Sequence, residues 1–148
     1  MNKLSSLAIA VAFGFAGHAF AADNTGMSKD AYKEAKDKIE AQYKSDKAAC
    51  DPMKGNAKDV CKAEAKGKEK VAKAELEAQY KPSSHNEEKA KMAKADADYD
   101  VAKEKCEDQK GSAKSACKKD AKTAHDSAKS QAKADAKAAA PADKDKKS

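Results

Sequence analysis

The sequence predicts an all-α protein made of two duplicated helical hairpins, four helices in total, each hairpin closed by a disulfide. Three observations carry this prediction. The four cysteines form two pairs with one spacing, in "CDPMKGNAKDVC" and "CEDQKGSAKSAC". Aligning residues 38–73 with residues 94–129 also matches a tyrosine, a glycine and many lysines and alanines, which indicates a duplicated supersecondary unit. Finally, apolar residues recur at steps of three, four and seven, the spacing of one helical face.

The composition argues against a compact enzyme with a conventional core. The chain has no Trp, and all 3 of its Phe residues lie within residues 1–20. Beyond that segment Ala, Lys, Asp and Glu dominate, which is typical of long helices or of solvated disorder. The formal charge is +6, and all basic charge comes from Lys. Acidic residues alternate closely with the lysines until about residue 120, so we expect a solvated helix surface laced with ion pairs.

Residues 1–21 are expected to be a secretory signal peptide. Lys3 supplies a positive start, the apolar run "LSSLAIAVAFGFAG" follows, and "AFA" fits a small-x-small cleavage site between Ala21 and Ala22. The run is too short to span a membrane. A transit peptide or a buried N-terminal helix is the alternative interpretation. We therefore expect an exported protein, periplasmic or secreted, without a transmembrane segment after the signal is removed.

The first hairpin is expected over residues 28–80. Ser28 is a candidate N-cap for its first helix. The apolar positions of that helix are Tyr32, Ile39, Tyr43 and Cys50. Pro52 and Gly55 interrupt the pattern, which predicts a tight turn.

The second helix of this hairpin is expected to open at a capping box formed by Asn56 and Asp59. It is expected to end at Lys81-Pro82-Ser83, because proline cannot continue a helix. Its stripe consists mostly of small residues: Val60, Ala63, Gly67, Val71, Ala74 and Ala78. Small side chains let two helices approach closely, so a thin hairpin can pack without a large core.

The second hairpin is expected over residues 84–137, and residues 138–148 are expected to be a disordered Lys-rich tail. Ser84 with Glu87 is a candidate cap for the third helix, and Ser112 for the fourth. The stripes of these helices are Met92, Ala95, Tyr99, Ala102 and Cys106, and then Cys117, Ala121, Ala124, Ala128 and Ala132. Whether the two hairpins form an elongated rod or a loose bundle stays open.

The cysteines are expected to pair within each hairpin, Cys50 with Cys61 and Cys106 with Cys117. Each disulfide would then join the end of one helix to the second turn of the next, a stabilisation of roughly 2.5–3 kcal/mol. The alternative is pairing between the repeats, with both loops helical; the glycines and the proline of the loops disfavour it. A zinc site is disfavoured because the chain has no C-x2-C spacing and no nearby His pair, and a redox-active pair because it typically uses C-x-x-C.

The exposed faces carry Glu–Lys pairs four residues apart, worth roughly 0.2–0.5 kcal/mol each on an isolated helix. These pairs are Glu34–Lys38, Glu40–Lys44, Glu64–Lys68, Glu69–Lys73, Glu77–Lys81 and Glu87–Lys91. Tyr43 and Tyr99 are expected to pack on the disulfides, with base stacking as the functional alternative. His85, in an interhelix loop, and His125, on a polar helix face, are expected to be plain surface residues. The sequence predicts no catalytic residue, metal ligand or cofactor site.

The segment "GNAKDVCKAEAKGKEKVAKAELEAQY", residues 55–80, resembles one found in small exported Ala/Lys-rich proteins of β-proteobacteria. These are uncharacterised or filed as TolA-like cell-envelope proteins, because the central helix of TolA is also rich in Ala, Lys and Glu. The resemblance covers most of the chain and implies an exported envelope protein with no catalytic residues. In composition the chain is also similar to late-embryogenesis-abundant proteins.

We therefore expect a non-enzymatic exported helical protein with an envelope-structural or stress-protective role. Its partners are not indicated by any motif; envelope components or another copy of the chain are candidates. The alternative is a polyanion-binding module for lipopolysaccharide, anionic lipid or nucleic acid. That alternative depends on the Lys-rich run from Lys118 to Lys147, which is similar in composition to linker-histone tails.

Overall fold

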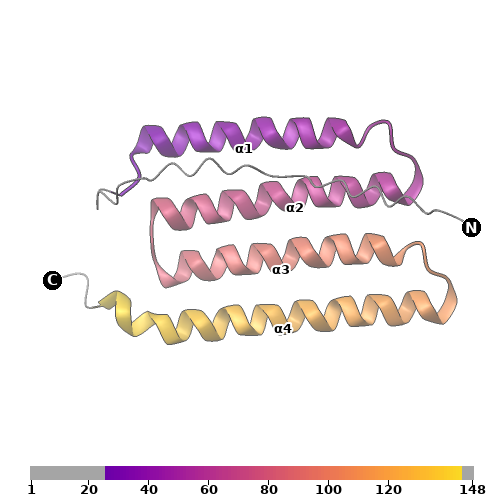
Figure 1. Cartoon of the computed structure of the whole chain (residues 1–148). Coiled ribbons are helices and arrows are strands. Elements are labelled where there is room, and N and C mark those ends of the chain that lie inside the picture. The colour runs from indigo at the N-terminus through magenta and orange to yellow at the C-terminus, as the bar shows by residue number, and fades with distance from the viewer. Residues whose placement is uncertain (1–25, 145–148) are drawn as a thin grey trace, which may run out of the picture.

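The computed structural model describes residues 26–144, and in that range the chain forms four antiparallel helices side by side (Figure 1). They are α1 (Lys29–Ala49), α2 (Gly55–Tyr80), α3 (Ser84–Cys106) and α4 (Gly111–Lys144). Disulfides Cys50–Cys61 and Cys106–Cys117 close the α1–α2 and α3–α4 hairpins. The predicted all-α fold of two disulfide-closed hairpins is confirmed, and so is the local pairing. The expected signal peptide and the cleavage site at Ala21 and Ala22 lie outside the described residues.

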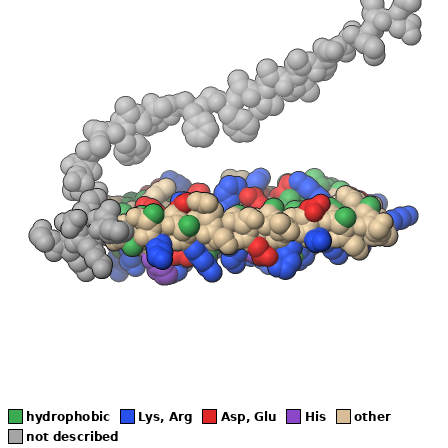
Figure 2. Space-filling model, turned by 90° about the horizontal axis from the view of Figure 1, so that it is seen from below, with side chains coloured by type: hydrophobic (Ala, Val, Ile, Leu, Met, Phe, Trp, Pro, Cys, Tyr) green, Lys and Arg blue, Asp and Glu red, His purple; other side chains and the backbone are tan. Residues whose placement is uncertain are grey.

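The four helices form a single layer. Within residues 26–144 the packed pairs are α1 with α2, α2 with α3, and α3 with α4; helices that are not consecutive do not pack on one another. Figure 2, seen from the α4 side, shows how thin this layer is. The two hairpins therefore pack on each other through α2 and α3. They form a flat layer of four helices and neither a four-helix bundle nor an end-to-end rod.

Small residues bring α2 and α3 together. Gly67 is buried against Ala97, and a Cβ added to Gly67 would lie only 2.9 Å from the Cβ of Ala97. Such a distance is shorter than real side chains allow, so the contact depends on glycine at this position. The few other buried side chains are also small, Leu76 excepted: Cys50, Ala65, Leu76, Ala95, Ala97, Cys106 and Ala132. The core therefore consists mainly of disulfide-bonded cysteines and alanines, because the described chain has few large apolar side chains.

The two hairpin turns have the same backbone conformation. Gly55 and Gly111 each have φ of 57°, a left-handed conformation that favours glycine. Both turns are closed by the same hydrogen bond, in which the amide three residues after the first cysteine donates to that cysteine's carbonyl: Met53 to Cys50 and Gln109 to Cys106. The structure thus repeats the duplication seen in the sequence.

The helix ends agree with the predictions at the start of α1, at the start of α3 to within one residue, and at the end of α2. Ser28 caps α1 as predicted, its Oγ accepting from the Ala31 amide at 3.1 Å. The cap of α3 is Ser83, one residue before the predicted Ser84, and its Oγ accepts from the Asn86 amide. Tyr80 ends α2 directly before the predicted Lys-Pro-Ser break.

The predicted capping box at Asn56 and Asp59 is wrong. Helix α2 begins at Gly55, and its N-cap residue Lys54 makes no side-chain cap hydrogen bond. Asn56 Nδ2 donates instead to the carbonyl of Glu104 at the end of α3, at 2.8 Å. Ser112 is likewise not a cap, because α4 already begins at Gly111. In both cases the glycine of the disulfide-closed turn begins the helix before the expected capping residue is reached.

Helix α4 continues past the expected boundary at residue 137 and ends at Lys144. The expected tail therefore does not begin at residue 138; residues 145–148 lie outside the described residues. Three consecutive alanines, residues 138–140, extend the helix here because alanine has the highest helix propensity. Pro141 lies in the last turn of α4, where its missing amide removes one backbone hydrogen bond.

Candidate functional site

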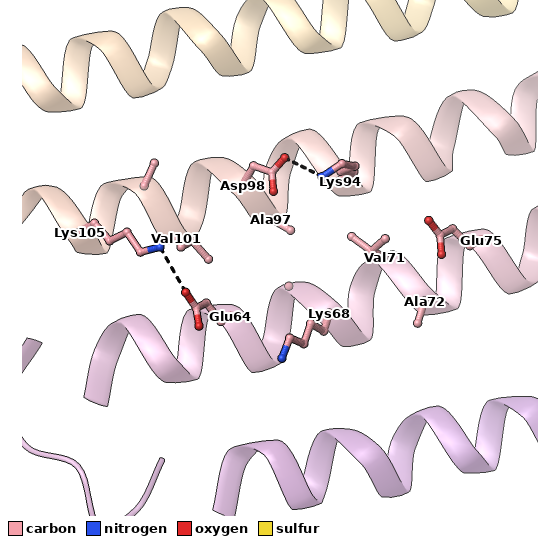
Figure 3. A pocket seen from close by; sticks show the side chains of 12 residues that line it. Glu64, Lys68, Val71, Ala72, Glu75, Lys94, Ala97, Asp98, Val101 and Lys105 are labelled. Carbon is pink, nitrogen blue, oxygen red and sulfur yellow. Dashed lines mark hydrogen bonds and ion pairs between the residues drawn. The ribbon is translucent and has the colours of Figure 1, made fainter. Parts of the chain in front are cut away.

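The helices α2 and α3 line an open groove on one face of the layer (Figure 3). Its volume is about 690 Å³. Gly67 and Ala97 form its buried floor, and Val71 and Val101 stand half-buried above them. Ala72 and Ala102 complete this apolar strip. An apolar surface of another molecule can therefore pack against the groove.

Charged side chains of alternating sign border the strip, as Figure 3 shows. Along α2 the order is Glu64, Lys68 and Glu75. Along the antiparallel α3 the facing order is Lys105, Asp98 and Lys94. Lys105 Nζ lies 3.3 Å from Glu64 across the groove, whereas Asp98 pairs with Lys94 on its own helix at 3.1 Å. Lys68 lies 4.0 Å from Asp46 of α1.

The opposite face of the α2–α3 seam has a different character. A smaller groove there, of about 350 Å³, is lined by Asp59, Lys62, Ala63, Lys66, Asp100 and Glu104. Its lining is almost entirely charged, and Lys70 bridges to Asp100 across the same seam at 3.7 Å. Only one of the two faces at this seam therefore offers an apolar strip.

Both disulfides lie at the same end of the layer, at the two cystine turns (Figure 1). Their Cα–Cα distances are 5.6 and 5.7 Å. The Asn56–Glu104 hydrogen bond ties the first cystine turn to the end of α3. Cys50 and Cys106 are the most completely buried side chains of the described chain. This end of the layer therefore carries both of the covalent links between helices.

An ion pair spans each cystine turn at equivalent positions of the repeat. Lys58 lies 3.7 Å from Asp51 in the first turn, and Lys114 lies 2.5 Å from Glu107 in the second. Lys118 adds a second ammonium to Glu107, also at 2.5 Å. Hydrogen bonds from these two lysines lower the pKa of Glu107 to about 2. Glu107 is therefore the most strongly held carboxylate among the groups whose pKa is shifted.

The repeat also carries equivalent ion pairs between the helices of each hairpin. Lys73 joins α2 to Glu40 on α1 at 3.3 Å, and Lys129 joins α4 to Asp96 on α3 at 3.2 Å. Of the six predicted pairs four residues apart, three form: Glu34–Lys38, Glu69–Lys73 and Glu77–Lys81. Several remaining members bind a neighbouring helix instead, among them Lys68 with Asp46 and Lys91 with Asp135. A neighbouring helix in the layer offers carboxylates that an isolated helix does not.

His125 is not the plain surface residue that the sequence predicts. Its side chain is only 15% exposed, stacks on the ring of Tyr99 at 4.6 Å, and places Nε2 2.6 Å from Asp96 Oδ1. The hydrogen bond with His125 is the main cause that lowers the pKa of Asp96. The ring contact that the structure shows for Tyr99 is thus with His125, where packing on the disulfide was expected. His85 is exposed, but in the first turn of α3 rather than in a loop.

A second aromatic pair secures the other hairpin. Tyr32 of α1 stacks on Tyr80 of α2, with ring centroids 4.3 Å apart. The Tyr32 hydroxyl donates to Glu77 at 2.8 Å, which raises the pKa of Tyr32 and lowers that of Glu77. These contacts join helix ends that are far apart in sequence, so helical periodicity alone does not reveal them.

The described residues hold no group of three or more His, Cys, Asp or Glu side chains that could bind a metal ion. All cysteines in this part of the chain are in disulfides. None of the described helices is both long and apolar enough to cross a membrane. The arrangement can therefore offer surfaces, an apolar groove and ion-paired edges.

No protein-family model, curated protein or solved structure matches the chain. The groove was not predicted from the sequence. Its apolar members, such as Val71 and Val101, are visible as stripe positions, but the stripes alone do not say which positions stay uncovered.

Proposed function

We propose that this chain is a non-enzymatic exported protein that protects or organises other molecules of the cell envelope. The observation that carries this proposal is the single layer, whose broad faces have no second layer packed on them within the described residues. Catalysis generally requires reacting groups held in a site from which water is excluded. The α2–α3 groove is an open trough, and so it favours contact with another surface over chemistry on a small molecule.

The disulfides bear on the compartment. They indicate an oxidising, extracytoplasmic environment, where such bonds form and persist. The proposed route there is the signal peptide at residues 1–21, with cleavage between Ala21 and Ala22 and release into the periplasm or medium. The similarity of residues 55–80 to exported Ala/Lys-rich envelope proteins supports the same compartment.

The charged surface of the layer supports the proposed protective role. Charged residues of both signs lie along all four helices, and Figure 2 shows them on the α4 side. They keep the layer hydrated, while its apolar strip provides weak contact with exposed apolar segments. The test is light scattering of a thermally unfolding enzyme, with residues 22–148 added at equal molar concentration. We expect slower aggregation of the enzyme. Its control is the same chain reduced and alkylated, which keeps the composition but loses both cystine turns. Unchanged aggregation in the presence of the oxidised chain would contradict the protective role.

One observation favours the second function, binding of polyanions. Lys119, Lys133 and Lys137 recur after whole helical turns on one side of α4, and no ion pair holds them within the described chain. Other lysines of the same run are held by carboxylates: Lys118 by Glu107, Lys122 by Asp126, and Lys129 by Asp96. Fewer lysines are free for phosphates than the composition implies.

This second function is tested with vesicles of anionic lipid and with lipopolysaccharide. Binding through lysines weakens steeply as salt rises from about 50 to about 200 mM. Replacing Lys119, Lys133 and Lys137 by Glu should abolish it. A chain that does not bind at the lowest salt has no polyanion function of this kind.

A further inference from the structure

We propose that the α2–α3 groove is the interface of a homodimer, in which a second copy of this chain covers the apolar strip face to face. The proposal goes beyond the protective role and does not depend on it. It starts from the asymmetry of the layer: the groove face has Val71, Val101 and alanines at the seam, whereas the opposite face at the same seam is lined almost entirely by charge. One face is thus suited to be covered and the other to remain in water.

The charges select a second copy as the occupant. The α2 edge of the groove reads negative, positive, negative at Glu64, Lys68 and Glu75. The α3 edge reads positive, negative, positive at Lys105, Asp98 and Lys94. A surface with this pattern is complementary to itself when one edge is laid on the other. Electrostatic complementarity of this kind fixes the register and the choice of partner.

The same pattern decides the symmetry of the dimer. A two-fold axis running along the groove places α2 of one copy on α3 of the other, so Glu64 meets Lys105 of the second copy. A two-fold axis running across the helices at the middle of the groove places α2 on α2 in antiparallel fashion, so Glu64 meets Glu75 of the second copy. The first arrangement brings opposite charges together along the groove, and the second brings like charges together. We therefore infer the axis along the groove.

The dimer should be weak. The groove is lined by 12 residues in each copy, whereas stable interfaces involve roughly 20–30 residues on each side. The dissociation constant of the dimer is consequently expected to be roughly micromolar. The side chains of Glu64 and Lys105 are 46% and 60% exposed and already pair within each copy. In the dimer, Glu64 and Lys105 of both copies form a network of four alternating charges at one end of the interface, because an axis along the groove keeps equivalent residues at the same end.

Sedimentation equilibrium of residues 22–148, over concentrations on both sides of the expected dissociation constant, tests the proposal. We expect a reversible monomer–dimer equilibrium. The single variants Glu64→Lys and Lys105→Glu each place like charges at both symmetry-related contacts between positions 64 and 105, so each should dimerise about tenfold more weakly. Lys66→Glu, which changes the same charge on the opposite face, is the matched control and should dimerise like the unaltered chain.

Mixing separates a true interface from general damage to the fold. In a heterodimer of Glu64→Lys with Lys105→Glu, both contacts between positions 64 and 105 of the two copies again pair opposite charges, so the mixture should associate more tightly than either variant alone. Several results would overturn the proposal. They are a chain that stays monomeric throughout, variants that dimerise like Lys66→Glu, and a mixture no tighter than its components. Tighter self-association of Glu64→Lys would show that the axis runs across the helices instead. The aggregation assay tests the protective role separately, so a result that overturns the dimer does not decide that role.

Discussion

Removing one disulfide should cost the fold a predictable free energy. The perturbation is the paired substitution Cys50→Ser with Cys61→Ser, which leaves no unpaired thiol because the second disulfide remains intact. The two cysteines are 11 residues apart in sequence, and opening a loop of this length lowers the free energy of unfolding by about 2.8 kcal/mol in the chain-entropy model. That loss corresponds to a decrease of roughly 10 °C in the melting temperature of a domain of this size.

The second hairpin provides an internal comparison. Cys106 and Cys117 have the same separation of 11 residues and a closely similar Cα–Cα distance, 5.7 Å against 5.6 Å. Substituting both by Ser should therefore lower the free energy of unfolding by the same amount. The quadruple variant, with all four cysteines replaced by Ser, should lose about twice as much, roughly 5.6 kcal/mol.

The assay is urea unfolding followed by circular dichroism at the helix band, with the oxidised chain as reference. The unaltered chain under reducing agent should have the same free energy of unfolding as the quadruple Ser variant. A paired Ser variant as stable as the oxidised chain would refute the reasoning, since it would mean that the turns are held without the covalent link. Strongly unequal losses from the two hairpins would refute the equivalence of the repeats.

Three further predictions concern single side chains. Gly67→Leu should lower the free energy of unfolding by about 1–3 kcal/mol because its side chain has no room against Ala97. Lys66→Leu on the same helix is the control, and equal urea midpoints for the two would contradict the close contact. Glu107→Gln should remove a stabilisation that is complete above the unfolded pKa of about 4.3 and is lost as pH falls toward the folded pKa of about 2. The melting temperatures of the two proteins should therefore converge on acidification, and a constant difference down to the lowest pH would contradict this. Asn56→Ala should cost about 1 kcal/mol by removing the hydrogen bond to Glu104. Unchanged hydrogen exchange at the end of α3 would argue against that link.

The local features of this protein could be predicted from its sequence. Helical periodicity, the glycines of the turns and the cap at Ser28 depend on residues within one or two turns of each other, and the structure confirms them. The pairing of Cys50 with Cys61 belongs to the same class, because both cysteines lie at one hairpin turn. Interactions over such short separations depend little on the rest of the fold.

Only the tertiary structure decided how the helices meet. The approach of Gly67 to Ala97 sets the register of α2 against α3. That register determines which stripe residues stay uncovered in the groove. It also brings Asn56 to Glu104, where a local cap was expected.

The partners of the charged side chains were decided at the same level. Lys73 binds Glu40 as well as the predicted Glu69, and His125 is drawn against Tyr99 and Asp96. A charged or aromatic side chain on a helix can reach several binding partners of similar interaction energy. Which of them it binds depends on the neighbouring helix that the layer places beside it. The sequence therefore determined the helices and their covalent links, and the packing of those helices determined the surfaces through which this protein can act.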